Sequence, residues 1–186
     1  MKKPWDNPKK YKHPTSPHHI EPTPPMVSIV GNSGAGKTTL IEKLIPEIIS
    51  RGLCVGTIKH DVHGFQMDKP GKDSWRHKQA GASATLISSP HQIGMVMDVD
   101  RERQPIELVS LLSHVDIVLL EGYKRAKHPK IEIFRPEAYP EPICRDDEHL
   151  IALVSNVPMD MGVLRFATDN IKGLTDFIID YFHLTV

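Results

Sequence analysis

The chain has 186 residues, 39% of them hydrophobic, and its 23 basic and 23 acidic residues give a formal net charge of zero at pH 7. This length fits one domain with at most a small appendage, and the charge balance excludes a global positive field that would recruit nucleic acid. No apolar run approaches the roughly 18 residues of a membrane span, and the N-terminus lacks the apolar core of a secretory signal. We therefore expect a cytoplasmic protein that binds neither nucleic acid nor a membrane.

The N-terminal segment, residues 1–25, differs in composition from the rest of the chain. It holds seven of the sixteen prolines, and five lysines against two acidic residues. Such a stretch cannot bury a core, so we expect an extended or disordered arm there and a folded domain over 26–186. The two cysteines, Cys54 and Cys144, have no metal-ligand spacing and are expected to be reduced thiols.

The clearest local signal is a glycine-rich loop between a short strand and a helix. Residues 31–38, Gly-Asn-Ser-Gly-Ala-Gly-Lys-Thr, match G-x-x-x-x-G-K-[ST] at every fixed position. A β-branched run at 27–30 predicts a strand before the loop, and an apolar stripe with helical spacing over 40–49 predicts a helix after it. A glycine-rich turn that binds nothing is the competing interpretation. The flanking strand and helix favour a nucleotide site over it.

Each fixed position of this loop has a physical role in holding phosphate. Gly31 and Gly36 allow the tight turn that points successive backbone N–H groups into one hollow, beside the positive end of the helix dipole. Lys37 would place its charge on the β- and γ-phosphates, and the Thr38 hydroxyl would bind Mg²⁺. The predicted phosphate site comprises Gly31, Asn32, Ser33, Gly34, Ala35, Gly36, Lys37, Thr38 and Thr39.

The second strand is expected over 53–59 and ends in polar residues, Lys-His-Asp at 59–61. Ligands of open α/β sheets bind at the carboxyl ends of the strands, so these residues are candidates for the same site. Between the first helix and this strand, Gly52 is placed to adopt a left-handed conformation that ends the helix. Pro46 is expected to kink that helix because it removes one backbone donor.

The middle of the chain predicts a short helix followed by a hairpin. Asp73 or Ser74 would cap a helix over 74–80. Residues 84–88 and 92–99 predict two strands. Their connection is too short for a parallel crossover, so the two strands should form an antiparallel hairpin.

The second central strand is predicted at 116–122, Asp-Ile-Val-Leu-Leu-Glu-Gly. Four consecutive apolar residues without alternation are typical of a strand buried on both faces. It would deliver Glu121 at its carboxyl end, where nucleotide-binding proteins place a carboxylate near Mg²⁺. Because Asp61 ends a strand at the same edge of the sheet, we expect Thr38, Asp61 and Glu121 to surround one Mg²⁺, directly or through water.

The remaining elements complete a mostly parallel central sheet flanked by helices, with the hairpin as an extension: an α/β fold of the P-loop NTPase type. They are a helix over 104–114 with Ile106, Val109 and Leu112 facing inward, a half-solvated strand over 130–135, strands at 150–154 and 164–167, and a closing helix over 171–181 capped by Asp169 or Asn170. The chain contains no N/T-K-x-D motif for guanine, and Asn156 and Asp169 are the residues placed where base contacts would arise.

Several short segments together resemble one family. They occur in the order GNSGAGKTTL at 31–40, KHD at 59–61, DKPGKDS at 68–74, AGA at 80–82, LLEGYK at 119–124 and PKIEIFR at 129–135. In this combination the chain resembles the molybdopterin-guanine dinucleotide biosynthesis protein B family (MobB), from about residue 26 to the C-terminus. The arm lies outside the resemblance.

The resemblance implies a GTP-binding adapter of molybdenum cofactor assembly, with slow Mg²⁺-dependent GTP hydrolysis and a homodimeric state. It implies partnership with the guanylyltransferase that joins GMP to molybdopterin, and contact with molybdopterin or molybdoenzymes. The family's polar site residues fall on Lys59, His60, Asp61, Asp68, Lys72, Asp73, Ser74 and Glu121. We add Lys124 as a candidate. Turn, cap or solvated-surface roles remain alternatives for the aspartates and lysines.

Three other functions remain open at this point. A small-molecule kinase would use the same loop, with Asp61 or Asp73 as general base, but no arginine-rich lid segment is evident. A metal-insertion GTPase resembling the nickel chaperones is suggested by the eleven histidines. A pure binding module would bind nucleotide without turnover. Fast hydrolysis needs a water-positioning residue and an arginine finger, and only Arg76 and His60 are candidates, so the enzyme we expect is at most a weak GTPase.

Overall fold

The structure is a computed structural model that describes residues 23–185. The predicted arm therefore lies outside the described residues, apart from its last three. Residues 23–185 divide into two compact units, of which one is Asp61–Arg103 and the other comprises 23–60 and 104–185. Within residues 23–185, no helix is both long and apolar enough to cross a bilayer.

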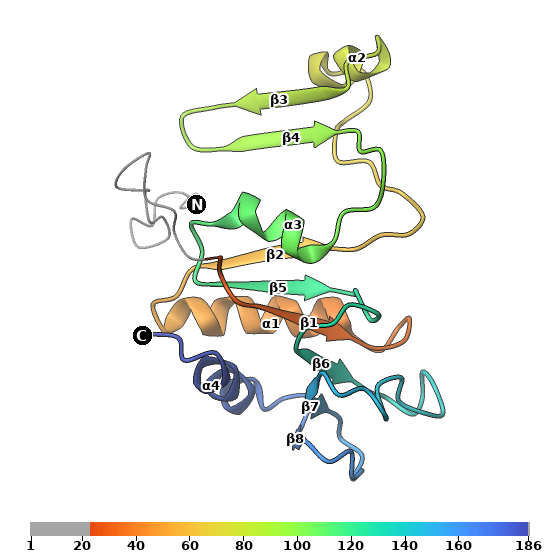
Figure 1. Cartoon of the computed structure of the whole chain (residues 1–186), viewed down its shortest axis with the longest axis vertical. Coiled ribbons are helices and arrows are strands. Elements are labelled where there is room, and N and C mark those ends of the chain that lie inside the picture. The colour runs from red at the N-terminus through yellow and green to blue at the C-terminus, as the bar shows by residue number, and fades with distance from the viewer. Residues whose placement is uncertain (1–22, 186) are drawn as a thin grey trace. The chain divides into compact units, whose positions relative to one another are not determined.

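The larger unit is built on a six-stranded sheet in the order β2-β5-β1-β6-β7-β8 (Figure 1). Every neighbouring pair of strands is parallel, which confirms the expected α/β fold. The strands are β1 (Met26–Val30), β2 (Val55–Lys59), β5 (Ile117–Glu121), β6 (Lys130–Ile133), β7 (Leu150–Val154) and β8 (Leu164–Phe166).

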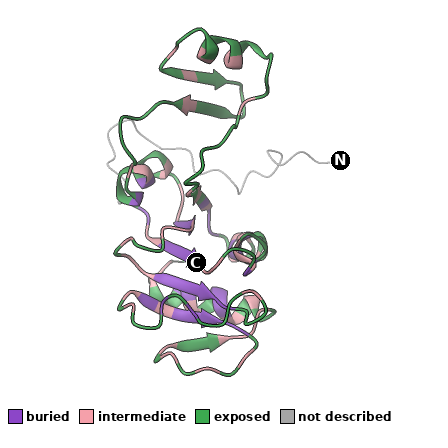
Figure 2. Cartoon of the chain, turned by 90° about the vertical axis from the view of Figure 1, so that its right-hand side faces the viewer, coloured by how far each residue is buried: buried purple, intermediate pink, exposed green. Residues whose placement is uncertain are grey.

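One face of this sheet packs against two helices, α1 (Lys37–Ser50) and α4 (Ile171–Tyr181). The predicted stripe of α1 is buried at Leu40, Ile41, Leu44 and Ile48, and Figure 2 shows buried residues concentrated in the central strands. Removing this much apolar surface from water is the main stabilising contribution to the unit. The ends follow the sequence signals, since Gly52 has a φ of 87° after α1 and the Asn170 side chain accepts a hydrogen bond from Gly173 N before α4.

The other face of the sheet is covered at β2 and β5 by a short helix, α3 (Pro105–Val109), and the 3-10 turn Ser110–Leu112 that continues it. Val109 is fully buried there against Val118 and Leu120. The prediction that Ile106 faces inward was wrong, since its exposed fraction is 61%. The helix has barely more than one turn, so its buried residues are the i, i+4 pair Pro105 and Val109 rather than the stripe of a longer helix.

Strand β6 corrects a second expectation. The sequence alternation predicted a half-solvated strand, but Lys130 and Glu132 are only 2% and 1% exposed. β6 lies between β1 and β7, so both of its faces are covered. Each polar side chain has a partner: Lys130 pairs with Asp147, and the Glu132 carboxylate accepts hydrogen bonds from the backbone N–H groups of Ile143 and Cys144.

The smaller unit contains α2 (Asp73–Gln79) and a two-stranded antiparallel sheet of β3 (Ala84–Ser88) and β4 (Ile93–Met97). The predicted hairpin is thus confirmed. The predicted cap is wrong, because α2 begins at Asp73 and its N-cap, Lys72, makes no side-chain cap hydrogen bond. Many apolar side chains of this unit are exposed, namely Val62, Phe65, Met67, Leu86, Ile87, Ile93, Met95, Met97 and Val99.

Candidate functional site

The glycine-rich loop connects β1 to α1 and adopts the strained backbone that its sequence predicts. Gly31, Gly34 and Gly36 have φ angles of 148°, 77° and 100°, a region that favours glycine. The loop also packs closely against the end of β6, since a Cβ atom on Gly31 would lie 2.5 Å from the carbonyl oxygen of Ile133. Ala35 is buried and its N–H donates to the carbonyl of Asn32. The loop shape therefore depends on glycine at these positions.

Lys37 folds back over this loop. Its Nζ donates hydrogen bonds to the carbonyl oxygens of Gly31 at 3.0 Å and Asn32 at 2.9 Å. Burial lowers the pKa of the Lys37 ammonium, the Glu121 carboxylate partly opposes this, and the charges of Lys124 and Lys59 lower the pKa further. Three lysines and one glutamate thus share this edge of the sheet, an arrangement that favours an anion.

Thr38 and Glu121 lie in direct contact, as the Thr38 Oγ1 donates a hydrogen bond to Glu121 Oε1 over 2.9 Å. The parallel register sets Glu121 opposite Ile29 on β1 and Lys59 on β2. The carboxyl ends of these strands therefore meet at the start of α1. A hydroxyl and a carboxylate side by side fit a Mg²⁺ ion that keeps several waters and takes one or two protein oxygens.

The turn after β5 holds Glu121 in place. Gly122 and Tyr123 both have positive φ angles, 96° and 55°. The backbone N–H of His60, at the end of β2, donates to the carbonyl of Glu121 at 3.0 Å, and the His60 and Tyr123 rings stack with centroids 4.6 Å apart. A non-glycine residue with positive φ is uncommon and marks a position that its surroundings constrain.

The other predicted site residues belong to the smaller unit. The Asp61 carboxylate accepts a hydrogen bond from His63 N, and the Asp68 carboxylate accepts one from Lys69 N. Lys72, Asp73 and Ser74 form the start of α2, where Asp73 lies 3.7 Å from Arg76. The proposed contribution of Asp61 to a Mg²⁺ site with Thr38 and Glu121 stays a prediction.

Arg135 is a site residue that the sequence reasoning missed. It follows β6, and its guanidinium Cζ lies 3.7 Å from where a Cβ atom on Gly36 would be. It lines a cleft of about 400 Å³ beside the loop, together with Gly34, Asn156 and Thr168. The same rule that selected Glu121, a position just after a strand adjoining β1, would have selected Arg135.

Asn156, one of the two residues suggested for a base contact, lines that cleft, and its role stays a prediction. Its Oδ1 accepts hydrogen bonds from Thr168 N at 2.9 Å and from Thr168 Oγ1 at 3.1 Å. Asp169 comes next in the chain, before the N-cap of α4. Across residues 23–185, no three His, Cys, Asp or Glu side chains gather as a metal site.

Comparison with known proteins decides the family. Residues 26–156 match MobB, described as molybdopterin guanine dinucleotide synthesis protein B. The chain belongs to this family. It is 37% identical over 164 residues to the molybdopterin-guanine dinucleotide biosynthesis adapter protein of Haemophilus influenzae, covering 86% of this chain and 90% of that protein. It is 36% identical to the Escherichia coli adapter protein, covering 84% and 93% of the two chains.

Solved MobB structures share the fold. A crystal structure of molybdopterin-guanine biosynthesis protein B matches at a TM-score of 0.66 and 28% identity, over 84% of this chain and 99% of that one. The crystal structure of Bacillus subtilis MobB matches at a TM-score of 0.69 and 26% identity, over 87% and 98%. These findings confirm the resemblance seen in the motifs, and they support an adapter role in molybdopterin guanine dinucleotide biosynthesis.

Proposed function

We propose that this MobB protein binds Mg-GTP at residues 31–39 and hydrolyses it slowly. In this role it assists the guanylyltransferase that joins GMP to molybdopterin, and it works in the cytoplasm. The observation that carries the proposal is the pairing of Thr38 with Glu121 beside a loop whose glycines have positive φ angles. That pairing supports a Mg²⁺ ion held by a hydroxyl and a carboxylate beside the γ-phosphate end of the nucleotide.

The electrostatics of the loop support an anionic ligand. Lys37 is desolvated and near two further lysines, so its ammonium gains from a phosphate that replaces the Gly31 and Asn32 carbonyls as hydrogen-bond acceptor. The N-terminus of α1 adds the positive end of its dipole. A triphosphate with bound Mg²⁺ satisfies all of these groups at once.

The cleft beside the loop is the proposed place for the base. It is open enough, at about 400 Å³, for a purine, and it lies at the ends of β6, β7 and β8. The Arg135 guanidinium would stack on the base or contact the α-phosphate, and the Asn156 amide would contact the base edge. Guanine rather than adenine is proposed from the family's product, which contains guanine.

The contacts of the two sequence candidates for fast catalysis support slow hydrolysis. His60 stacks on Tyr123, and Arg76 lies 3.7 Å from Asp73 within α2. Both are engaged in contacts that do not serve a phosphate. A GTPase without a positioned water and an arginine finger turns over slowly, and a partner would then supply the missing groups.

We also propose that the protein is a homodimer joined through the smaller unit. In the part of the chain that is described, β3 and β4 pair only with each other, and a lone two-stranded hairpin is marginally stable in water. Ile93 and Met97 are 73% and 52% exposed, on a sheet whose strand edges remain open. A second copy of the same hairpin offers matching edges and apolar faces, so self-association would bury both.

Titration calorimetry tests nucleotide binding. We expect GTP to bind with Mg²⁺ more tightly than ATP, and Lys37→Ala to weaken binding by about ten-fold or more, the loss expected for a charge-assisted contact. Lys43→Ala, on the exposed side of α1, is the matched control and should leave the affinity unchanged. Equal affinity of the Lys37 variant and the wild type would contradict a phosphate site at the loop. GTP turnover, measured alone and with the guanylyltransferase, separates a weak GTPase from a pure binding module.

Sedimentation tests the dimer. Ile93→Lys should shift the protein toward monomer by placing a charge in the proposed interface, whereas Ile106→Lys, at a comparably exposed apolar residue of the larger unit, should not. A wild-type protein that is monomeric at micromolar concentration would contradict the proposal.

A further inference from the structure

A second cleft, of about 700 Å³, lies in the larger unit and shares no lining residue with the cleft beside the loop. The connection between β5 and β6 forms one wall, and the segment before β7 forms the other. The cleft is wide and largely open to solvent, so a ligand there would be held mainly by polar contacts with its walls. The nucleotide proposed above would use none of its lining residues except Lys124 at the rim.

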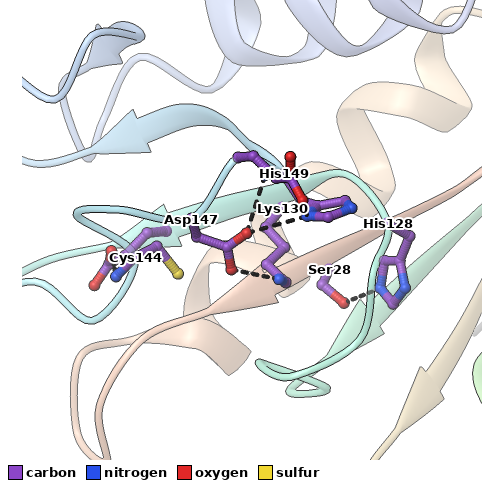
Figure 3. A network of polar contacts seen from close by, with 8 residues as sticks. Ser28, His128, Lys130, Cys144, Asp147 and His149 are labelled. Atoms are coloured by element: carbon purple, nitrogen blue, oxygen red, sulfur yellow. Dashed lines mark hydrogen bonds and ion pairs between the residues drawn. The ribbon is translucent and has the colours of Figure 1, made fainter.

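The floor of this cleft is a polar network around a buried ion pair (Figure 3). Lys130 Nζ lies 2.5 Å from Asp147 Oδ2, and the Lys130 side chain is only 3% exposed. Asp147 Oδ1 accepts hydrogen bonds from the backbone N–H of His149 and contacts its ring Nδ1 at 3.3 Å. A buried ion pair is weak evidence for a stabilising role, because the desolvation of both charges offsets their attraction. At the cleft, this pair joins β6 to the segment that forms the second wall.

One wall carries three exposed cations within four residues, Lys124, Arg125 and Lys127. Within the described chain, none of the three forms an ion pair, whereas Arg145 on the opposite wall is bound to Glu141 at 2.9 Å. Unpaired cations grouped at the mouth of a concave site attract phosphate, for which lysine and arginine are the usual ligands.

The opposite wall carries negatively charged side chains. Asp146 and Glu148 are exposed carboxylates at the same cleft, and carboxylates accept hydrogen bonds from N–H donors. A ligand that satisfies both walls carries a phosphate at one end and N–H groups at the other. A bare anion would be repelled by the second wall, and an extended acidic peptide would meet those carboxylates as well.

The cleft also adjoins the candidate nucleotide site. Its basic wall begins three residues after Glu121, and the charge of Lys124 acts on Lys37. The family makes a product that joins a pterin to a guanine nucleotide, so two neighbouring sites on one protein would hold the two parts.

We propose that this cleft binds a phosphorylated pterin, with its phosphate on Lys124, Arg125 and Lys127 and its ring N–H groups on Asp146 and Glu148. The proposal rests on the function proposed above, because it identifies the glycine-rich loop as the place of the guanine nucleotide. A ligand in the cleft would also contact the connection that follows Glu121. Binding of the ligand would thereby be linked to the nucleotide site.

Neopterin monophosphate is the probe, titrated by calorimetry into the full chain with saturating Mg-GDP. We expect one site, and we expect the double variant Arg125→Ala, Lys127→Ala to weaken it by about ten-fold, the equivalent of one charge-assisted contact. GDP affinity should not change in this variant. The double variant Lys43→Ala, Lys172→Ala removes two exposed cations elsewhere and should leave probe binding intact. Asp146→Asn with Glu148→Gln should weaken the probe but not inorganic pyrophosphate.

Several outcomes would overturn the proposal. They are a probe that does not bind, a probe displaced by GDP, an equal loss in the control variant, and pyrophosphate that binds as tightly as the probe. If the wild type does not bind the probe and the Arg125, Lys127 variant no longer binds the guanylyltransferase, the cleft is a protein docking surface and not a pterin site. GDP binding is measured in the same experiments, so failure of the loop as a nucleotide site would be recognised separately.

Discussion

Thr38 Oγ1 donates a hydrogen bond to Glu121 Oε1 over 2.9 Å, although the two residues are 83 positions apart in the chain. Thr38 lies in the first turn of α1, and Glu121 is the last residue of β5. Strand β1 precedes α1 in the chain and is the neighbour of β5 in the sheet. The parallel arrangement of β1 and β5 brings their carboxyl ends to the same edge, so the contact is a consequence of the fold. Its chemistry, a hydroxyl against a carboxylate, is what a Mg²⁺ ion would use.

Glu121→Gln tests this metal site. Glutamine keeps an oxygen acceptor for Thr38 but removes the charge, so Mg-GTP binding should weaken by about ten-fold. Metal-free binding should be unchanged or tighter, because a carboxylate without metal repels phosphate. Calorimetry with and without Mg²⁺ measures the two affinities. The control is Glu42→Gln, at an exposed residue of α1. Asp61→Asn is predicted to act in the same direction. If neither variant changes the Mg²⁺ dependence, Glu121 is a structural acceptor that holds the turn at Gly122 and Tyr123.

Arg135→Ala tests the cleft beside the loop. The guanidinium is close to Gly36 and lines the proposed base pocket, so we expect GTP affinity to fall by roughly three- to ten-fold, as for one exposed cationic contact. Arg135→Lys should recover only part of the loss, because lysine lacks the planar group that stacks on a base. Fluorescence titration with a labelled GTP analogue measures the series. Arg145→Ala, an exposed arginine of the other cleft, is the control; an equal loss there would remove Arg135 from the site.

The sequence predicts most of the fold because its signals are local. The short apolar runs, the glycines after the helices and the hairpin spacing identify every strand and helix of the described chain. Two wrong predictions, the inward-facing Ile106 and the cap of α2, concern local detail, whereas the burial of β6 depends on partners distant in the chain. Lys130 and Glu132 alternate with isoleucines as a half-solvated strand would, and only Asp147 and the Ile143 and Cys144 N–H groups, from a loop 11 to 17 residues later, allow them to be buried.

The candidate site likewise contains residues that a local pattern predicts and contacts that depend on the order of the strands. Gly31 to Thr39, and Glu121, are recognised from a motif and from a strand end. Arg135 follows a predicted strand, so the rule that selected Glu121 would have selected it too. The Thr168 contact to Asn156 depends on strand order, which local pattern does not encode. The second cleft could not be predicted at all, because its two walls come from separate connections that only the order β1-β6-β7 brings together.

Gly31→Ala tests how closely the loop is fitted to β6. A methyl group would lie 2.5 Å from the Ile133 carbonyl oxygen, at a backbone φ of 148° that L-residues rarely adopt, so the loop must shift. We expect the protein to lose about 1–3 kcal/mol of stability in urea unfolding and to bind GTP more weakly, in line with the cost of such strain. Gly94→Ala is the control, since nothing lies within 4 Å of the added methyl and its φ is not positive. If the Gly31 variant were as stable as the wild type, the loop would be able to shift without cost, and the prediction would be wrong.

The last prediction concerns the buried pair of Lys130 and Asp147. Asp147→Asn leaves the Lys130 ammonium, 3% exposed, without its counter-charge. Because the Asp147 side chain is itself 23% exposed, we expect a loss of at most about 3 kcal/mol, the lower end of the range for buried pairs. Replacement of both members, Lys130→Met with Asp147→Leu, should cost far less, because no charge is then left buried. Urea unfolding at pH 7 measures both variants, and Asp146→Asn, at the exposed neighbour, is the control.

The same pair predicts a pH dependence. Burial alone would raise the pKa of Asp147, but hydrogen bonds from Lys130 and from His149 N, with the charge of Lys130, outweigh it and lower the pKa below its usual value. A carboxyl whose pKa is lower in the folded state contributes stability above the unfolded pKa of about 4, and that contribution is lost as the pH falls through the folded value. The difference in unfolding free energy between wild type and Asp147→Asn should therefore be largest at pH 5–7 and shrink below pH 4. A difference that is the same at pH 3 and pH 7 would mean that Asp147 acts through shape and hydrogen bonding rather than charge.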